Sequence, residues 1–297
     1  MGYNALLREK RVIRPNYGNS KAGFRPYGAG FGADGEGYVV GGAGSGLNGA
    51  EAAVYGLLRS DIALIANGSR TATVMQYPAS AVYCKTDFTA DDFEGISVII
   101  ADGEITPEAQ EAMEQIVEID FQLVLEALIC DCPYDLYWFN NPGGISIEYP
   151  VPVITDETTI SIEGDLVVSF QVSADYALND NVYECNPIYG QSVMAAAQNA
   201  GSIVQEYSDA SDRGKLAGYA IEICVLTEYN YEALGETVPY GNPWQMIWVF
   251  DGNPETNVVC EGYSKAFQYL CDLTDFSNPS IHVITVSGTL SENAGHS

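Results

Sequence analysis

The chain has 297 residues, of which 47% are hydrophobic and 18% charged, so it can bury a substantial core in one large or two smaller domains. Its formal net charge is −28, and half of its 12 lysines and arginines lie in the first 25 residues. So acidic a body repels phosphate groups, which argues against nucleic acid and anionic membrane surfaces as partners of the folded part. No window reaches the ~18 apolar residues that span a bilayer, and the first 30 residues lack the apolar region of a secretory signal.

The cysteines give no sign of a metal site, because they lack repeated CxxC spacing and clustered histidines. We therefore expect no metal and no cofactor. Their odd number leaves two alternatives open, three disulfides with one free thiol or seven reduced thiols. The seven are Cys84, Cys130, Cys132, Cys185, Cys224, Cys260 and Cys271.

The N-terminal part contains a glycine-rich stretch, with 10 glycines in residues 27–49. Glycine loses much backbone freedom on ordering, so we expect a flexible leader over residues 1–47. From Ala50 the apolar spacing is helical, and Gly68 is placed to end that helix. A second helix is predicted from Thr106 to Cys130, with the threonine as its N-cap.

The middle of the chain changes to period-two alternation between Ile145 and Ser173, which indicates a strand pair or a small sheet. Helical spacing returns over Val193–Tyr207 and Ser211–Leu226. A further helix is predicted to start near Cys260, followed by a strand over Ile281–Ser287. Helices and strands that are not joined as repeated crossover units indicate an α+β fold.

A glycine-rich motif, Gly44-Ser-Gly-Leu-Asn-Gly49, satisfies the dinucleotide pattern GxGxxG ahead of a predicted helix. The strand before it is short, and no acidic residue ends a second strand about 20 residues later, as that motif requires. Nucleotide binding is thus kept as a third hypothesis, one that requires ordered structure at these glycines.

Cys260 is the sequence's candidate nucleophile, because it precedes a helical pattern and the positive end of a helix dipole stabilises a thiolate. A nucleophilic thiol also needs a base, and the chain holds only two histidines. His282 is expected to be partly buried on a strand, on one face with Ile284. His296 follows a turn of small residues that could present its imidazole to a cleft. On the residues alone, a buried cysteine and a loop histidine remain the alternative.

The segment Val259-Cys-Glu-Gly-Tyr-Ser-Lys-Ala-Phe267 closely resembles the nucleophile motif of the bacterial transglutaminase-like superfamily, usually Val-Cys-Glu-Gly-Tyr-Ala-x-Ala-Phe. Three other stretches resemble parts of the same family more weakly. They are Val286-Ser-Gly288 followed by Gly295-His296, the Lys215–Leu226 helix followed by Tyr229-Asn-Tyr231, and Asp131–Phe139.

The resemblance implies a papain-like core over residues 191–297, preceded by an α+β extension over residues 48–190 with a helix and a small sheet. Cys260 would attack a carbonyl and His296 would relay the proton. Gln245 and Trp244 are candidate oxyanion donors, beside the backbone N–H of Cys260. The family's orienting Asp follows the His by some 15 residues, and the sequence stops at Ser297, so we expect a fragment with weak activity or none.

The function implied is thioester-mediated acyl transfer or hydrolysis on protein or peptide amides. The partner would be a protein or peptide, for example one associated with a cell wall, and family analogy favours an extracellular or cell-surface location. The alternative is a catalytically inactive domain of the same fold that binds a partner at its surface.

Overall fold

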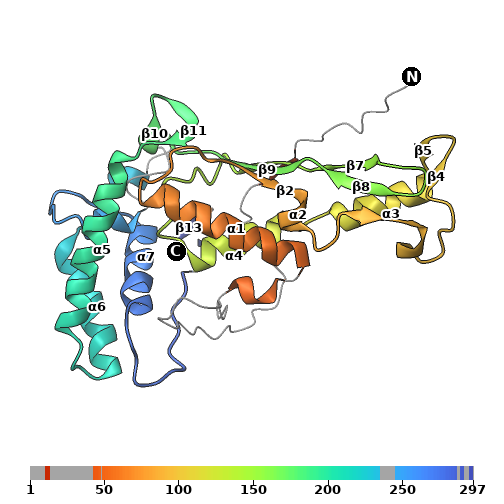
Figure 1. The fold of residues 1–297 in the computed structure, drawn as a ribbon. Coiled ribbons are helices and arrows are strands. Elements are labelled where there is room, and N and C mark those ends of the chain that lie inside the picture. The colour runs from red at the N-terminus through yellow and green to blue at the C-terminus, as the bar shows by residue number, and fades with distance from the viewer. Residues whose placement is uncertain are drawn as a thin grey trace.

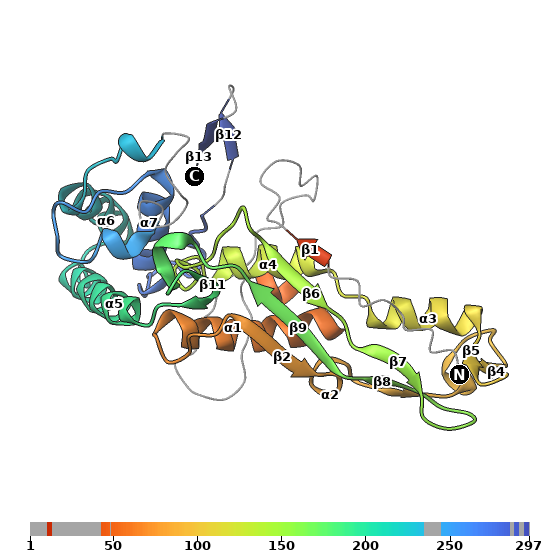
Figure 2. The same cartoon turned by 90° about the horizontal axis from the view of Figure 1, so that it is seen from above.

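The computed structural model has a mixed α+β architecture, a sheet backed by helices with a helical cluster at one end (Figure 1). Seen from above, a narrow ribbon of strands extends from the sheet to the opposite end, where helix α3 (Pro107–Val117) lies beside it (Figure 2). The α+β class predicted from the sequence is confirmed. The structure describes residues 11–13, 43–47, 49–234, 245–285, 288–290 and 294–296.

The main sheet has four antiparallel strands. In its centre Ile147 lies opposite Val168, and both side chains are fully buried. The small sheet predicted for residues 145–173 is confirmed, although burial does not strictly alternate, since Ser146 and Ser169 on the other face are buried as well. In spatial order the strands are β1 (Arg11–Ile13), β6 (Ile145–Glu148), β9 (Asp165–Phe170) and β2 (Val74–Pro78).

The ribbon continues this sheet outward past Gly164, whose φ of +92° allows the chain to change direction between two strands. It consists of β7 (Val151–Ile154), β8 (Ile160–Glu163) and the short β3 (Asp87–Phe88). Shorter elements accompany it: α2 (Ala79–Val82), η2 (Ala90–Asp92), β4 (Ile100–Ala101) and β5 (Glu104–Ile105).

Two helices, α1 (Gly49–Ala66) and α4 (Phe121–Asp131), cover one face of the sheet (Figure 1). Their apolar stripes form the centre of the core, including Leu58, Val124 and Leu128 at 0% exposure. The first helix ends as predicted, because Gly68 adopts a φ of +78° just beyond it.

The prediction of a single helix from Thr106 to Cys130 is wrong, because the structure has two helices there, separated by residues 118–120. The N-cap prediction is confirmed, since the Thr106 hydroxyl accepts a hydrogen bond from the Ala109 N–H at 3.4 Å and α3 spans Pro107–Val117. The chain then becomes extended at Glu118, and the Asp120 carboxylate caps α4 by accepting from the Leu123 N–H at 3.1 Å. The capping aspartate therefore divides one apolar pattern into two helices.

The helical end of the molecule consists of α5 (Ile188–Glu206), α6 (Asp212–Leu226) and α7 (Cys260–Asp272). The predicted helices are confirmed, although α5 begins earlier than its apolar spacing suggested. Ser211 caps α6 through its hydroxyl, which accepts from the Gly214 N–H at 3.2 Å. The remaining elements are η3 (Ala174–Tyr176), β10 (Ala177–Leu178), β11 (Asn181–Cys185), η4 (Glu232–Leu234) and η6 (Met246–Trp248).

The stretch that follows α4 attaches this helical end to the sheet. Trp138 is fully buried and packs edge to face on Phe170 of β9. On the other side the ring of Tyr134 lies 4.7 Å from that of Tyr269 on α7. The position of α7 is thus set from the sheet through one short aromatic segment.

Two pieces of the expected leader, β1 and η1 (Ala43–Gly46), are described and pack against the body; the rest of residues 1–42 lies outside the described residues. In the predicted strand Ile281–Ser287, residues 281–285 form no strand and the last two residues are not described. Strand pairing begins instead at β12 (Gly288–Leu290), with β13 (Ala294–His296) beside it.

Candidate functional site around Cys260

The thiol predicted to be the nucleophile lies at the first residue of α7. Val259, which precedes it, is extended and makes no side-chain cap, so no side chain of the N-cap competes for the N–H groups of the first turn. Cys260 is half-buried, in contrast to the buried Cys132, Cys185 and Cys271. The positive end of a 13-residue helix therefore acts on a thiol that solvent and reagents can still reach.

The approach to Cys260 is fixed by the segment that leaves α6. The Asn230 N–H donates to the Val258 carbonyl at 2.9 Å, and the Val258 N–H donates to the Glu228 carbonyl at 3.3 Å. From α7, the Tyr263 hydroxyl donates to the Thr227 carbonyl at 3.0 Å. The backbone bonds hold both the N–H and the carbonyl of Val258, two residues before the candidate nucleophile.

Tyr229 lies in the middle of this paired segment and contacts the candidate nucleophile. Its ring stacks on that of Tyr263, with centroids 6.1 Å apart and planes 20° from parallel. Burial raises the pKa of the Tyr229 hydroxyl, and a side-chain hydrogen bond with Cys260 raises it further. No chemical role was predicted for this tyrosine from the sequence; the available signal was its place in the Tyr-Asn pair after the Lys215–Leu226 helix.

Gln245, an oxyanion candidate, is fully buried beside α7. Its side-chain oxygen accepts a hydrogen bond from the Lys265 ammonium at 3.1 Å, and that ammonium also pairs with Glu261 at 2.7 Å. Because an ammonium can only donate, the atom facing Lys265 must be the oxygen. The amide nitrogen then faces away from Lys265, and this buried donor has no hydrogen-bond partner among the described residues. Trp244, the other oxyanion candidate, lies outside the described residues.

His296 is placed by its backbone, as the last residue of β13, where it pairs with Gly288 of β12. The hairpin joins α7 through residues 273–285 and projects from the body (Figure 2). The other histidine, His282, is exposed, so its expected burial was wrong. Exposure alternates along residues 281–285, and the face that His282 shares with Ile284 points outward.

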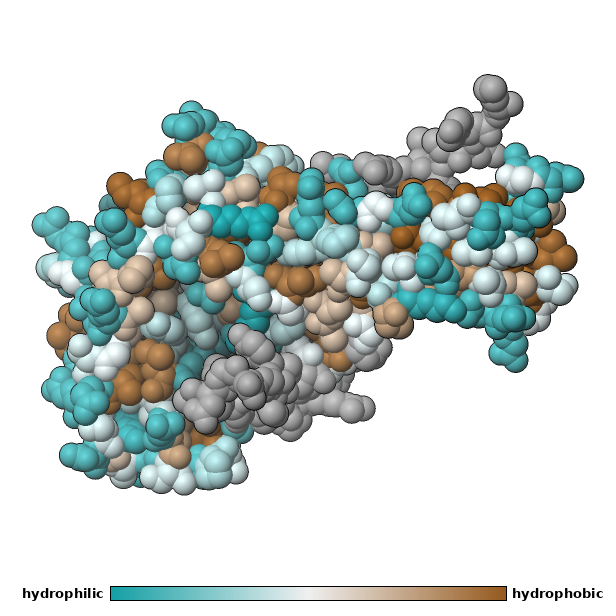
Figure 3. Space-filling model, in the orientation of Figure 1, coloured by the Kyte–Doolittle hydropathy of each residue, from teal (hydrophilic) through white to brown (hydrophobic). Residues whose placement is uncertain are grey.

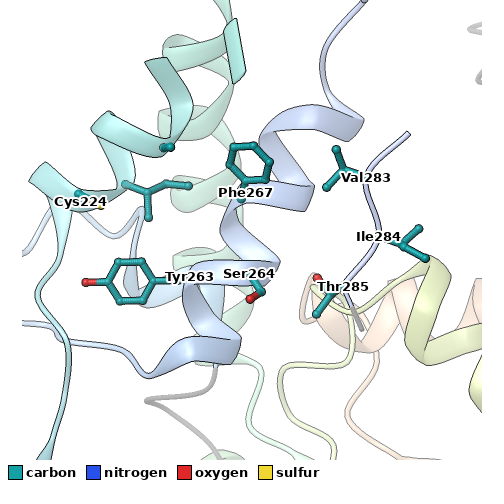
Figure 4. Close-up of a pocket in the computed structure, with 9 residues that line it drawn as sticks. Cys224, Tyr263, Ser264, Phe267, Val283, Ile284 and Thr285 are labelled. Atoms are coloured by element: carbon teal, nitrogen blue, oxygen red, sulfur yellow. The ribbon is translucent and has the colours of Figure 1, made fainter. Parts of the chain in front are cut away.

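A groove of about 400 Å³ runs between α6, α7 and residues 283–285 (Figure 4). Its α7 wall lies one helical turn beyond the candidate nucleophile, since the Ser264 hydroxyl donates to the Cys260 carbonyl at 3.0 Å. The outer wall is held by the buried Gln268, whose side-chain oxygen accepts from the Thr285 N–H at 2.7 Å. The lining residues are Ala220, Ile223, Cys224, Tyr263, Ser264, Phe267, Val283, Ile284 and Thr285.

The glycine-rich dinucleotide motif is used for packing. The Gly44 N–H donates to the Asp131 carboxylate at 2.9 Å, and a Cβ on Gly44 would lie 2.6 Å from the ring of Tyr55. An amide that already binds a carboxylate does not offer itself to a phosphate, and the carboxylate would repel one. The described part of this motif thus argues against a nucleotide site.

Among the described residues, no three histidine, cysteine or acidic side chains converge on a point where they could hold a metal ion. All seven cysteines are described, and none forms a disulfide. None of the described helices combines the length and the hydropathy that crossing a bilayer requires.

Comparisons of the chain with family models, with curated proteins and with solved structures found no match. The transglutaminase-like resemblance therefore stays a prediction carried by the motifs themselves.

Proposed function

We propose that this chain carries the nucleophile of a thioester-mediated acyl transfer or hydrolysis on protein or peptide amides, within a transglutaminase-like, papain-type core. The observation that carries the proposal is the position of Cys260, half-buried at the first residue of α7 with the Tyr229 hydroxyl beside it. A helix N-terminus and a hydroxyl donor both stabilise a thiolate, which is the reactive form of cysteine.

In the proposed reaction the Cys260 sulfur attacks the amide carbonyl carbon, and the C–N bond breaks. Ammonia or an amine leaves with a proton supplied by a general acid, the role proposed for His296. Water or a second amine then attacks the thioester and regenerates the thiol. Two donors are proposed for the oxyanion formed on the way: the backbone N–H of Cys260 and the buried amide nitrogen of Gln245, which has no partner among the described residues.

The partner in this proposal is a protein or peptide, and we place the reaction outside the cell or at its surface.

A second candidate function is surface binding without catalysis. It is favoured by apolar side chains that α5 and α6 expose, such as Met194 at 56% and Val225 at 75%. Figure 3 shows hydrophobic residues among hydrophilic ones at this end of the molecule.

The test is alkylation by iodoacetamide, followed at each cysteine by mass spectrometry from about pH 5 to about pH 9. Cys84 is exposed and remote from α7, so it supplies the internal reference rate. We expect Cys260 to react at least about tenfold faster than Cys84 below about pH 7, and to slow in His296→Ala. Equal rates at the two cysteines at every pH would overturn the catalytic proposal and leave surface binding.

A further inference from the structure

We propose that the groove between α6 and α7 binds an apolar side chain of a cationic peptide, next to the carbonyl that Cys260 attacks. This inference rests on the proposed function and adds the substrate class. It starts from the position of the groove relative to the thiol. Tyr263 and Ser264 lie three and four residues after Cys260 on the same helix, hence on the same face.

The distance along α7 from Cys260 to the groove is similar to the spacing of adjacent residues in an extended substrate. One helical turn is about 5.4 Å, and neighbouring Cα atoms of an extended peptide are about 3.8 Å apart. A peptide whose reacting carbonyl lies at Cys260 can therefore place the side chain of the preceding residue against Tyr263 and Phe267. Figure 4 shows both rings on the α7 wall, with Val283 and Ile284 on the segment across the groove.

The lining determines what kind of side chain is bound. None of the nine lining residues carries a formal charge at neutral pH, and six of them are Ala, Ile, Phe or Val or present a tyrosine ring. A volume of about 400 Å³ is at the small end of ligand sites, which suits one or two side chains rather than a folded partner. A charged side chain there would lose its hydration without a partner, so the groove selects for apolar ones.

The surroundings determine the charge of the peptide. Between Ile188 and Thr285 the described residues include 11 acidic and three basic side chains. Two of the basic ones are buried and bound: Lys265 to Glu261, and Lys215 to the Asp275 carbonyl at 2.9 Å. Arg213 alone among these three is exposed, so the field around the groove is negative and attracts lysine and arginine on a substrate.

Binding is tested without catalysis, using the full chain with Cys260→Ala. The probe is a fluorescein-labelled peptide, Lys-Lys-Leu-Gln-Gly-Lys, and its affinity is measured by fluorescence anisotropy. We expect replacement of its leucine by aspartate to weaken binding by about tenfold or more, as loss of one buried side chain does. Raising the ionic strength from about 0.05 M to about 0.5 M should weaken it further, because the attraction to lysine is screened.

The groove is then blocked by Ala220→Trp, at an exposed position that lines it. The control is Ala217→Trp, exposed on the same helix one turn earlier and outside the groove. Blocking should cost at least about tenfold in affinity and the control less than about twofold. Equal effects of the two variants, or equal affinity for the leucine and aspartate peptides, would overturn the proposal.

The same chain with Cys260 intact separates this inference from the proposed function. Peptide binding that depends on Ala220, combined with an iodoacetamide rate at Cys260 no higher than at Cys84, would retain the groove as a peptide site and reject catalysis. A fast Cys260 with no peptide preference would retain catalysis and reject the groove.

Discussion

The Lys265 ammonium donates a hydrogen bond to the side-chain oxygen of Gln245 at 3.1 Å, and the two residues are only 5% and 0% exposed. The bond joins α7 to the segment before η6 and fixes which end of the amide faces away from the helix. A lysine inside the nucleophile motif thus orients the one side-chain oxyanion candidate that the structure describes.

Lys265→Met tests this relationship, because methionine keeps the unbranched chain and removes the donors. We expect a loss of about 3 kcal/mol in the free energy of unfolding, since the Glu261 carboxylate, whose side chain is only 16% exposed, loses the Lys265 ammonium. The double variant Lys265→Met with Glu261→Gln should recover a large part of that loss. The measurement is urea unfolding, and additive effects of the two substitutions would contradict the buried pair.

Gly262→Ala probes the glycine of the motif. Alanine is normally favoured in a helix by about 1 kcal/mol, but a Cβ here would lie 2.7 Å from the Val258 Cβ. We expect the clash to dominate and the variant to be about 1–3 kcal/mol less stable in denaturant unfolding. Gly201→Ala on α5 is the control, because its Cβ would meet nothing within 4 Å; it should stabilise by about 0.5–1 kcal/mol. Stabilisation by both substitutions would reject the packing argument.

The buried carboxyl of Asp272 makes the free energy of unfolding depend on pH. Burial raises the pKa of this carboxyl to about 7, against its ordinary value of 3.8, so the folded state binds the proton more tightly. The contribution of the protonated Asp272 carboxyl to stability is therefore complete below about pH 4 and is lost as the pH rises through about 7. Asp272→Asn should be more stable than the parent chain at about pH 8, by on the order of 2 kcal/mol or more, and the difference should vanish near pH 4. Thermal unfolding of both chains at several pH values measures this difference in stability. A difference that does not change with pH would contradict the raised pKa of Asp272.

Tyr229→Phe tests the hydroxyl beside the candidate nucleophile. The phenyl ring keeps the stack on Tyr263, whereas the hydroxyl group beside Cys260 is removed. We expect alkylation of Cys260 near pH 6.5 to slow about three- to tenfold, because a donor stabilises the thiolate. Tyr231→Phe is the control, since Tyr231 is 77% exposed, and it should leave the rate unchanged.

Most elements follow from local patterns in the sequence. The helical spacing after Ala50 and the alternation at residues 145–173 required only the two periods of regular structure. The break between α3 and α4 was missed because Asp120 lies within an apolar pattern that suits one long helix. Whether such a residue lies on the helix surface or caps a new helix depends on the direction the chain must take in the fold.

For the candidate site, the sequence determined the thiol at the start of a helix, because a motif and an apolar period are local properties. Only the tertiary structure decided its neighbours. It brought Tyr229 to Cys260, paired the buried amide of Gln245 with Lys265, and opened an apolar groove beside the thiol. These contacts join residues 15 or more positions apart, and such distances are set by the packing of α6, α7 and η6, which no local pattern encodes.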